Sequence, residues 1–217
     1  MKKLLLLTFI TTVTSLAIQA QGIRLNGYVN YTFDDRFEAY NSATSYFNGT
    51  IKGGMQWGAG LEYMASPELG IAATYYRQDT KAPVTYWDNI NNQVANRELD
   101  IAINYIMGGT TGYVSPNPKI EGYGGIMLGA VIYNNKMPIA GDPTSSTKFA
   151  WGVKLGANIW ATEKVGIKLQ GHLLSGVQSA GGGFYFGTGG SGTGITTYST
   201  LYQFSLGGGL VFRLTGE

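Results

Sequence analysis

The sequence predicts an all-β chain, namely an eight-stranded antiparallel up-and-down transmembrane β-barrel. Three observations support this fold class. Segments of about ten residues alternate apolar and polar side chains, the links between them are mostly long and short in turn, and the composition is unlike that of a soluble domain. Only 13 % of the 217 residues are charged, against about 25 % in soluble domains. Glycine supplies 33 residues, which suits strands whose outer face does not meet water.

The first 20 residues predict a cleaved signal peptide, which leaves 21–217 as one barrel domain. Lys2 and Lys3 precede the apolar run 4–18, and Ala20 offers a small residue for cleavage. A single-span anchor is the alternative, but it needs about 20 predominantly apolar residues. Without the two lysines the chain has 13 basic residues (15 − 2) against 13 acidic ones, which gives no basic field for nucleic acid. Cysteine is absent, so disulfides and thiolate metal sites are excluded.

Eight alternating segments follow, each with one apolar face. The expected strands cover residues 23–34, 50–64, 69–78, 98–107, 120–133, 149–160, 165–174 and 201–214. The apolar faces of the first four strands carry, in order, Ile23, Leu25 and Val29; Met55, Trp57 and Leu61; Leu69, Ile71 and Tyr75; and Leu99, Ile101, Ile103, Tyr105 and Met107. Glycine weakens the alternation of the fifth strand. The last three apolar faces carry Phe149, Trp151 and Val153; Val165, Ile167 and Leu169; and Phe204, Leu206 and Phe212.

The links place large loops at one rim and tight turns at the other. Long links are expected at 35–48, 79–97, 134–147 and between the last two strands, whereas "ASPE" and "ATEK" are short. The polar face of the strands decides which side is inside, because it mixes glycines with isolated charges instead of dense Lys and Glu. That face fits the narrow lumen of an eight-stranded barrel, and aromatic residues near the strand ends fit interfacial girdles. A soluble exported barrel, apolar inside, is the alternative.

Signal peptide, alternating strands, glycine-rich lumen face and the last strand "YQFSLGGGLVFRL" together resemble the small OmpA/OmpX/OmpW-type outer-membrane β-barrel proteins. The "AQG" after the signal is similar to proteins of Bacteroidetes type. The resemblance covers the mature chain and implies the outer membrane of a Gram-negative bacterium, with outer-membrane lipid as one partner. In one respect the chain departs from the family, because it runs past Phe212 instead of ending on an aromatic residue.

A network of charges is expected inside the barrel, where unpaired ions would cost several kcal/mol each. Its members would be Arg24, Lys52, Glu62, Glu98, Asp100, Glu121, Lys154, Lys168, His172 and Arg213. Cross-lumen ion pairs that plug the barrel are one interpretation, and a gate that opens a small channel is the other. Arg24, Glu62 and Arg213 should lie together near the tight-turn rim.

No catalytic, metal or cofactor site is expected. His172 is the one histidine, and Ser175 lies three residues on, which places the two side chains on opposite faces of a strand. Gly187, Gly189 and Gly192 match a dinucleotide fingerprint, but that fingerprint needs a following helix, and "ITTYSTLYQFSL" predicts a strand. The match is a chance one within a long loop.

The long loops hold the remaining functional candidates, which are the aromatic residues Tyr86, Trp87, Phe184, Tyr185 and Phe186. Exposed loop aromatics either bind a partner or pack on one another. The leading hypothesis is therefore a non-enzymatic outer-membrane barrel with a structural or surface-binding role, whose further partner would be an extracellular or envelope protein. A narrow pore or transporter of small hydrophobic solutes is the alternative, and a lipid-modifying enzyme is the third class.

Overall fold

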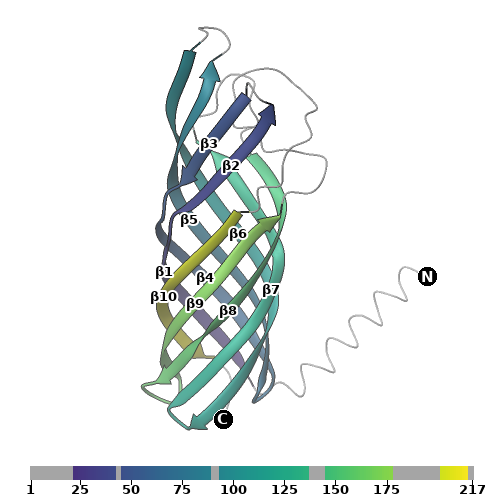
Figure 1. The fold of residues 1–217 in the computed structure, drawn as a ribbon. Coiled ribbons are helices and arrows are strands. Elements are labelled where there is room, and N and C mark those ends of the chain that lie inside the picture. The colour runs from purple at the N-terminus through teal and green to yellow at the C-terminus, as the bar shows by residue number, and fades with distance from the viewer. Residues whose placement is uncertain (1–21, 43–44, 89–92, 137–144, 178–200, 215–217) are drawn as a thin grey trace, which may run out of the picture.

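The computed structural model describes residues 22–42, 45–88, 93–136, 145–177 and 201–214, which form ten antiparallel strands (Figure 1). The expected signal peptide lies outside these residues. Within them, no helix is long and apolar enough to cross a membrane. The strands are β1 Ile23–Thr32, β2 Asp35–Ser42, β3 Ser45–Ile51, β4 Gly54–Ser66, β5 Leu69–Asp88, β6 Gln93–Asn117, β7 Ile120–Asn135, β8 Ser145–Trp160, β9 Val165–Val177 and β10 Leu201–Arg213.

Eight of the strands close into a barrel, as the sequence predicts. Around its circumference they run β1, β10, β9, β8, β7, β6, β5 and β4, and β4 pairs with β1 again. Four pairs of strands therefore face each other across the lumen: β1 and β7, β5 and β9, β6 and β10, and β4 and β8. At the short-turn end the first and last strands meet, where the amide of Leu214 donates to the carbonyl of Ile23.

The remaining two strands, β2 and β3, occupy the expected long link 35–48, so this link is a hairpin and not a loop. The register of β1 with β4 continues across a break into β2 and β3, because Thr32 pairs with Gly54 and Asp35 with Ile51. At the break the Asp34 carboxylate accepts a hydrogen bond from the Gly53 amide at 2.7 Å. Strand β3 of this hairpin pairs with β5, so the hairpin extends the wall beyond the eight-stranded barrel.

The link 79–97 is also largely strand. β5 and β6 stay paired from Leu69 with Gly112 up to Asp88 with Gln93, and their hairpin rises above the neighbouring strands (Figure 1). A tilted strand crosses the bilayer core in about 9–11 residues, whereas β5 has 20 residues and β6 has 25. About half of each strand therefore extends past the membrane.

The outer wall of the barrel is an apolar belt. Leu61, Ile126 and Leu155 are 56, 60 and 67 % exposed without lipid, and alternate positions on every barrel strand add to the same surface. Soluble monomers rarely expose contiguous apolar patches of this extent. Charged side chains are buried inside instead. The prediction of a transmembrane barrel is therefore confirmed, and the alternative of a soluble barrel with an apolar interior is excluded.

The lumen is filled by large side chains set against glycines, as expected for so narrow a barrel. A Cβ at Gly58 would stand 2.7 Å from Cδ1 of Tyr76, and one at Gly156 would stand 2.6 Å from Oη of Tyr123. Each tyrosine ring thus occupies the space that a glycine leaves open. The glycine-rich inner face is a packing device and not a sign of flexibility.

One strand faces the opposite way from the prediction. Leu99, Ile101, Ile103, Tyr105 and Met107 were expected to face lipid, but all five are buried inside, at 0–3 % exposure. The physical reason is that this part of β6 lies mostly beyond the apolar belt, where the outer face meets water and the inner face is apolar. Hydrophobic alternation alone cannot distinguish that arrangement from its inverse.

Candidate functional site

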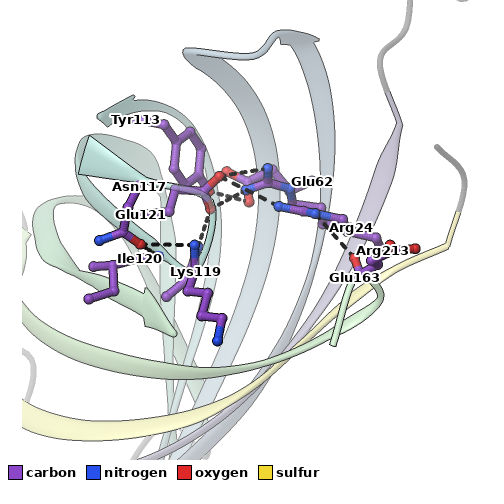
Figure 2. Close-up of polar contacts among 10 residues, drawn as sticks. Arg24, Glu62, Tyr113, Asn117, Lys119, Ile120, Glu121, Glu163 and Arg213 are labelled. Atoms are coloured by element: carbon purple, nitrogen blue, oxygen red, sulfur yellow. Dashed lines mark hydrogen bonds and ion pairs between the residues drawn. The ribbon is translucent and has the colours of Figure 1, made fainter. Parts of the chain in front are cut away.

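The lumen is crossed by an ion pair at the short-turn end (Figure 2). Arg24 on β1 donates to both carboxylate oxygens of Glu121 on β7, at 2.7 and 3.0 Å. The Asn158 amide donates to the same carboxylate at 2.8 Å, and Arg213 stands 4.0 Å away from it. Because β1 and β7 are opposite walls, this bidentate contact spans the full width of the barrel.

Aromatic rings and a second carboxylate surround this ion pair. The Arg24 guanidinium lies 4.8 Å from the ring centre of Tyr113 and 5.4 Å from that of Trp160, and Arg213 lies 3.6 Å from the latter. Glu62, which pairs with Arg24 in the β1–β4 register, accepts a hydrogen bond from Tyr113 at 2.6 Å. Arg24, Glu62 and Arg213 do gather at this rim, but Arg24 pairs with Glu121 and not with its register neighbour.

Two lysines occupy the next layer of the lumen. Lys154 and Lys168 are buried, at 5 and 2 % exposure, and Lys168 lies 4.0 Å from the ring centre of Tyr123. Among the described residues, neither ammonium group comes within 4.0 Å of a carboxylate oxygen. The cation–π contact with the tyrosine ring thus helps to hold Lys168 in this layer.

His172 belongs to a hydrogen-bonded layer halfway along the lumen. The Gln170 amide nitrogen donates to Tyr76 Oη and to His172 Nδ1, both at 3.1 Å. His172 Nε2 then donates to the Gln56 amide oxygen at 2.9 Å. This pattern assigns a neutral imidazole that carries its proton on Nε2. Its ring stacks on Tyr76, with centroids 4.9 Å apart.

Above this layer a tyrosine and two glutamines cross the barrel. Tyr105 Oη on β6 donates to Gln203 on β10 at 2.7 Å, and Gln203 donates to Gln78 at 2.9 Å. Tyr105, which was expected on the lipid-facing side of its strand, is therefore a lumen residue. Beyond it the interior becomes apolar, with a cluster that includes Leu99, Ile101 and Val131, each at 0–3 % exposure.

Three residues expected in the lumen lie elsewhere. Lys52, Glu98 and Asp100 are on the outer face, where Glu98 pairs with Lys81 and lies 4.0 Å from Lys52. The break between β3 and β4 shifts the alternation, so that Lys52 turns outward. Glu98 and Asp100 follow the reversed facing of β6. The hydrogen bond from Lys81 lowers the pKa of Glu98.

A second charged group lies nearby on the same outer wall. Arg77 donates to both oxygens of Asp79 at 3.0 Å, and Lys136 donates to Asp79 at 2.7 Å. These bonds, from Arg77 above all, lower the pKa of the Asp79 carboxyl to about 2. No sequence motif indicated this group, because Lys136, the residue directly after β7, comes beside Asp79 only through the pairing of β7 with β6 and of β6 with β5.

The histidine and serine considered as a hydrolytic pair point apart. Ser175 is register partner to Trp151 and Tyr202, whose rings make an edge contact 6.3 Å apart on the outer face. His172 lies in the lumen. Within the described ranges, no group of three or more His, Asp or Glu side chains could hold a metal ion. The geometry offers no assembled catalytic group at either residue.

The aromatic loop candidates are placed only in part. Tyr86 and Trp87 are strand residues at the outer end of β5, paired with Ala95 and Val94 of β6. Phe184, Tyr185 and Phe186 lie outside the described residues, as do the glycines of the chance fingerprint. Gln56, Gln78 and Gln203 are lumen residues that no motif indicated, although each lies on the inward face expected from the alternation of its strand.

No family model and no curated protein matches the chain. Among solved structures it is similar to Neisserial surface protein A, at 13 % identity over 90 % of this chain and 99 % of that chain, with a TM-score of 0.56. It is also similar to the outer-membrane protein OprG of Pseudomonas aeruginosa, at 13 % identity over 90 % of this chain and 97 % of that chain (TM-score 0.54). The outer-membrane protein AlkL matches at 14 % identity over 91 % of this chain and 93 % of that chain (TM-score 0.53).

These likenesses concern the fold. They confirm the predicted architecture, because each of these solved proteins is a small barrel of the outer-membrane kind and nearly its whole length is matched. The expected Bacteroidetes type stays a prediction.

Proposed function

We propose that this chain is an integral outer-membrane protein of a Gram-negative bacterium, that its own side chains close its lumen, and that it acts by binding a partner at its outer end. The partner would be an extracellular or envelope protein, and no catalytic role is assigned. The expected short turns then face the periplasm, and the tall hairpins face outward. The apolar belt, the outer-membrane fold and the extended hairpins support this proposal.

The closed lumen rests on one observation: opposite walls touch at three heights. Arg24 meets Glu121 between β1 and β7, and Gln170 meets Tyr76 between β9 and β5. Tyr105 meets Gln203 between β6 and β10. All six side chains belong to residues that are at most 7 % exposed, and the contacts join walls that lie diametrically opposite. A continuous water path would have to break all three contacts.

A closed lumen predicts that the protein shows no channel conductance in single-channel recordings. Wild-type protein in planar bilayers is expected to give no conductance steps. The double variant Tyr76→Ala/Tyr105→Ala removes two of the three crossings and is expected to conduct intermittently, in the intervals when the remaining Arg24–Glu121 contact is broken. Its matched control, Tyr31→Ala/Tyr202→Ala, removes two rings from the outer face, where both are about half exposed, and should stay silent.

Two results would favour the rival interpretations. Steps from the wild-type protein would favour a narrow pore, or with solute uptake a transporter of small hydrophobic compounds. Steps that appear with Glu62→Ala alone would favour the gate, because that variant leaves all three crossings in place.

The outward-facing role predicts a definite orientation, which cysteine labelling can measure because the chain has no cysteine. Trp87→Cys, at the tip of the β5–β6 hairpin, is expected to react with a membrane-impermeant maleimide on intact cells. Thr162→Cys, in the exposed turn between β8 and β9, should react only after the cells are opened. The reverse pattern would overturn the orientation.

Cysteine variants also test the binding role. A photo-activated cross-linker on Asp88→Cys, which leaves Tyr86 and Trp87 in place, is expected to capture one defined envelope or extracellular protein, and Tyr86→Ser in that background should weaken the capture. Thr162→Cys serves as the control for non-specific capture. Equal capture from both positions would contradict a binding role for the hairpin tip.

A further inference from the structure

The outward-facing side chains of β5 change from apolar to charged at one depth along the barrel wall. Leu69, Ile71 and Ala73 belong to the apolar belt, Tyr75 follows, and the next outward residues are Arg77 and Asp79. Adjacent outward residues on a strand are about 6.6 Å apart along it. The change from apolar to charged side chains therefore takes place over a single step, which is the depth at which lipid headgroups begin.

Neighbouring strands supply polar and aromatic groups at the same level. Trp57 on β4 and Asn104 on β6 are the register partners of Arg77. Asn104 accepts a hydrogen bond from Tyr75 Oη at 2.7 Å and lies 3.4 Å from Arg77 Nη1. The rings of Trp57 and Tyr75 meet edge to face, 5.7 Å apart. With Asp79 and Lys136, these residues form what we name the outer-rim cluster.

The outer-rim cluster carries a net positive charge. Two cations, Arg77 and Lys136, share the single carboxylate of Asp79. The two cations are 32 and 49 % exposed as side chains, and each keeps hydrogen-bond donors that Asp79 does not use. In the adjoining group Lys52 and Lys81 share Glu98, and with Asp100, a further carboxylate on this wall, that group is formally neutral. Asp79 thus holds two cations in place without neutralising both.

We propose that the outer-rim cluster is a binding site for the phosphorylated headgroup of a lipid in the outer leaflet. Arg77 and Lys136 would donate charge-assisted hydrogen bonds to the phosphate. Trp57 and Tyr75 would flank the junction of headgroup and acyl chain, where amphipathic rings are favoured. The cluster adjoins the apolar belt directly, so a lipid bound here would place its acyl chains against Ile71 and Ile106. A free phosphate has no acyl chains and could not make this contact.

The proposal rests on the transmembrane placement of the barrel and on its proposed orientation, but not on the closed lumen. Loss of lipid binding would leave the recordings silent, and a conducting lumen would leave lipid binding unchanged. The cysteine labelling measures orientation by itself. Failure of one proposal is thus distinguishable from failure of the other.

Binding of diphosphoryl lipid A to the reconstituted full-length protein tests the site. The probe is added as a minor component of phosphatidylcholine vesicles, alongside the same lipid A without phosphates. Arg77→Gln/Lys136→Gln is expected to weaken binding of the diphosphoryl form roughly tenfold or more, because each cation near a lipid surface contributes substantially. The matched control, Lys119→Gln/Lys164→Gln, removes two exposed cations at the opposite rim and should bind like wild type.

Four outcomes would overturn the proposal. The first is unchanged binding by Arg77→Gln/Lys136→Gln, once heat-modifiable gel migration has shown that the variant is folded. The second is equal binding of the phosphate-free lipid. The third is equal weakening by the control variant. The fourth is full competition by millimolar inorganic phosphate, which would identify a free-anion site in place of a lipid site.

Discussion

Replacing Glu121 by alanine is expected to destabilise the barrel by about 3–5 kcal/mol, because it leaves a buried cation without its partner. The side chains of Arg24 and Glu121 are 8 and 6 % exposed, so water cannot take over the lost contact. Asn158 would lose an acceptor in the same step. Tryptophan fluorescence during reversible urea unfolding from lipid vesicles measures the free energy of unfolding.

Two further variants decide whether the effect is electrostatic. Glu163→Ala removes a carboxylate from the exposed turn at the same end of the barrel and should change stability by less than about 0.5 kcal/mol. Arg24→Met/Glu121→Met removes both charges and should recover most of the loss, because apolar replacement of a buried ion pair is often neutral. If Arg24→Met/Glu121→Met were no more stable than Glu121→Ala, the unpaired Arg24 cation would not be the source of the loss.

Much of the barrel could be predicted because one rule applies along most of it. On β1, β8, β9 and β10 the outer face meets lipid and the inner face is polar, so hydrophobic alternation gave the correct facing. On β6 the rule fails beyond the membrane, where Leu99 and Ile101 fill an apolar interior and Glu98 faces water. Hydrophobic alternation shows which face of a strand is apolar. Whether that face points into the lumen depends on whether the segment lies within the bilayer or beyond it.

The partners within the lumen could not be predicted from the sequence. Arg24 and Glu121 are 97 residues apart, and their meeting depends on how the closed sheet staggers its strands. The sequence does place both on inward faces near the short-turn end, where Arg24 has a nearer acidic candidate in register, Glu62, and a second cation, Arg213, on its other side. The pairing across the diameter becomes visible only once closure puts β1 opposite β7.

The hairpin β2–β3 shows a different limit. Residues 35–48 read as a loop because the alternation stops at Asp34, yet the register of β1 and β4 resumes beyond it. A hydrogen bond from the Gly53 backbone amide to the Asp34 carboxylate bridges the break. Here a side-chain acceptor takes the place of a backbone acceptor, which interrupts the hydrophobic alternation without ending the sheet. The same interruption moves Lys52 to the outer face.

Gly156→Val is expected to cost at least about 1–3 kcal/mol, the usual penalty for overpacking a filled interior. A Cβ at this position would meet the Leu169 carbonyl oxygen and would stand 2.6 Å from Tyr123 Oη. The tyrosine has little room to withdraw, because its hydroxyl bonds to Gln170 at 3.2 Å and its ring lies against Lys168. The same urea unfolding experiment measures the loss.

Gly27→Val is the matched control, because a Cβ at Gly27 has no atom within 4 Å. Gly27 lies on the outer face of β1, where valine suits both strand and lipid, so this variant should be neutral or slightly stabilising. Equal losses at the two glycines would mean that the backbone, and not the tyrosine packing, limits substitution. If Gly156→Val does not fold, Gly156→Ala gives a measurable loss, and Tyr123→Ala in that background should relieve part of it, since contacting residues couple non-additively. Relief of this kind would establish that Gly156 leaves open the space in which the Tyr123 ring packs.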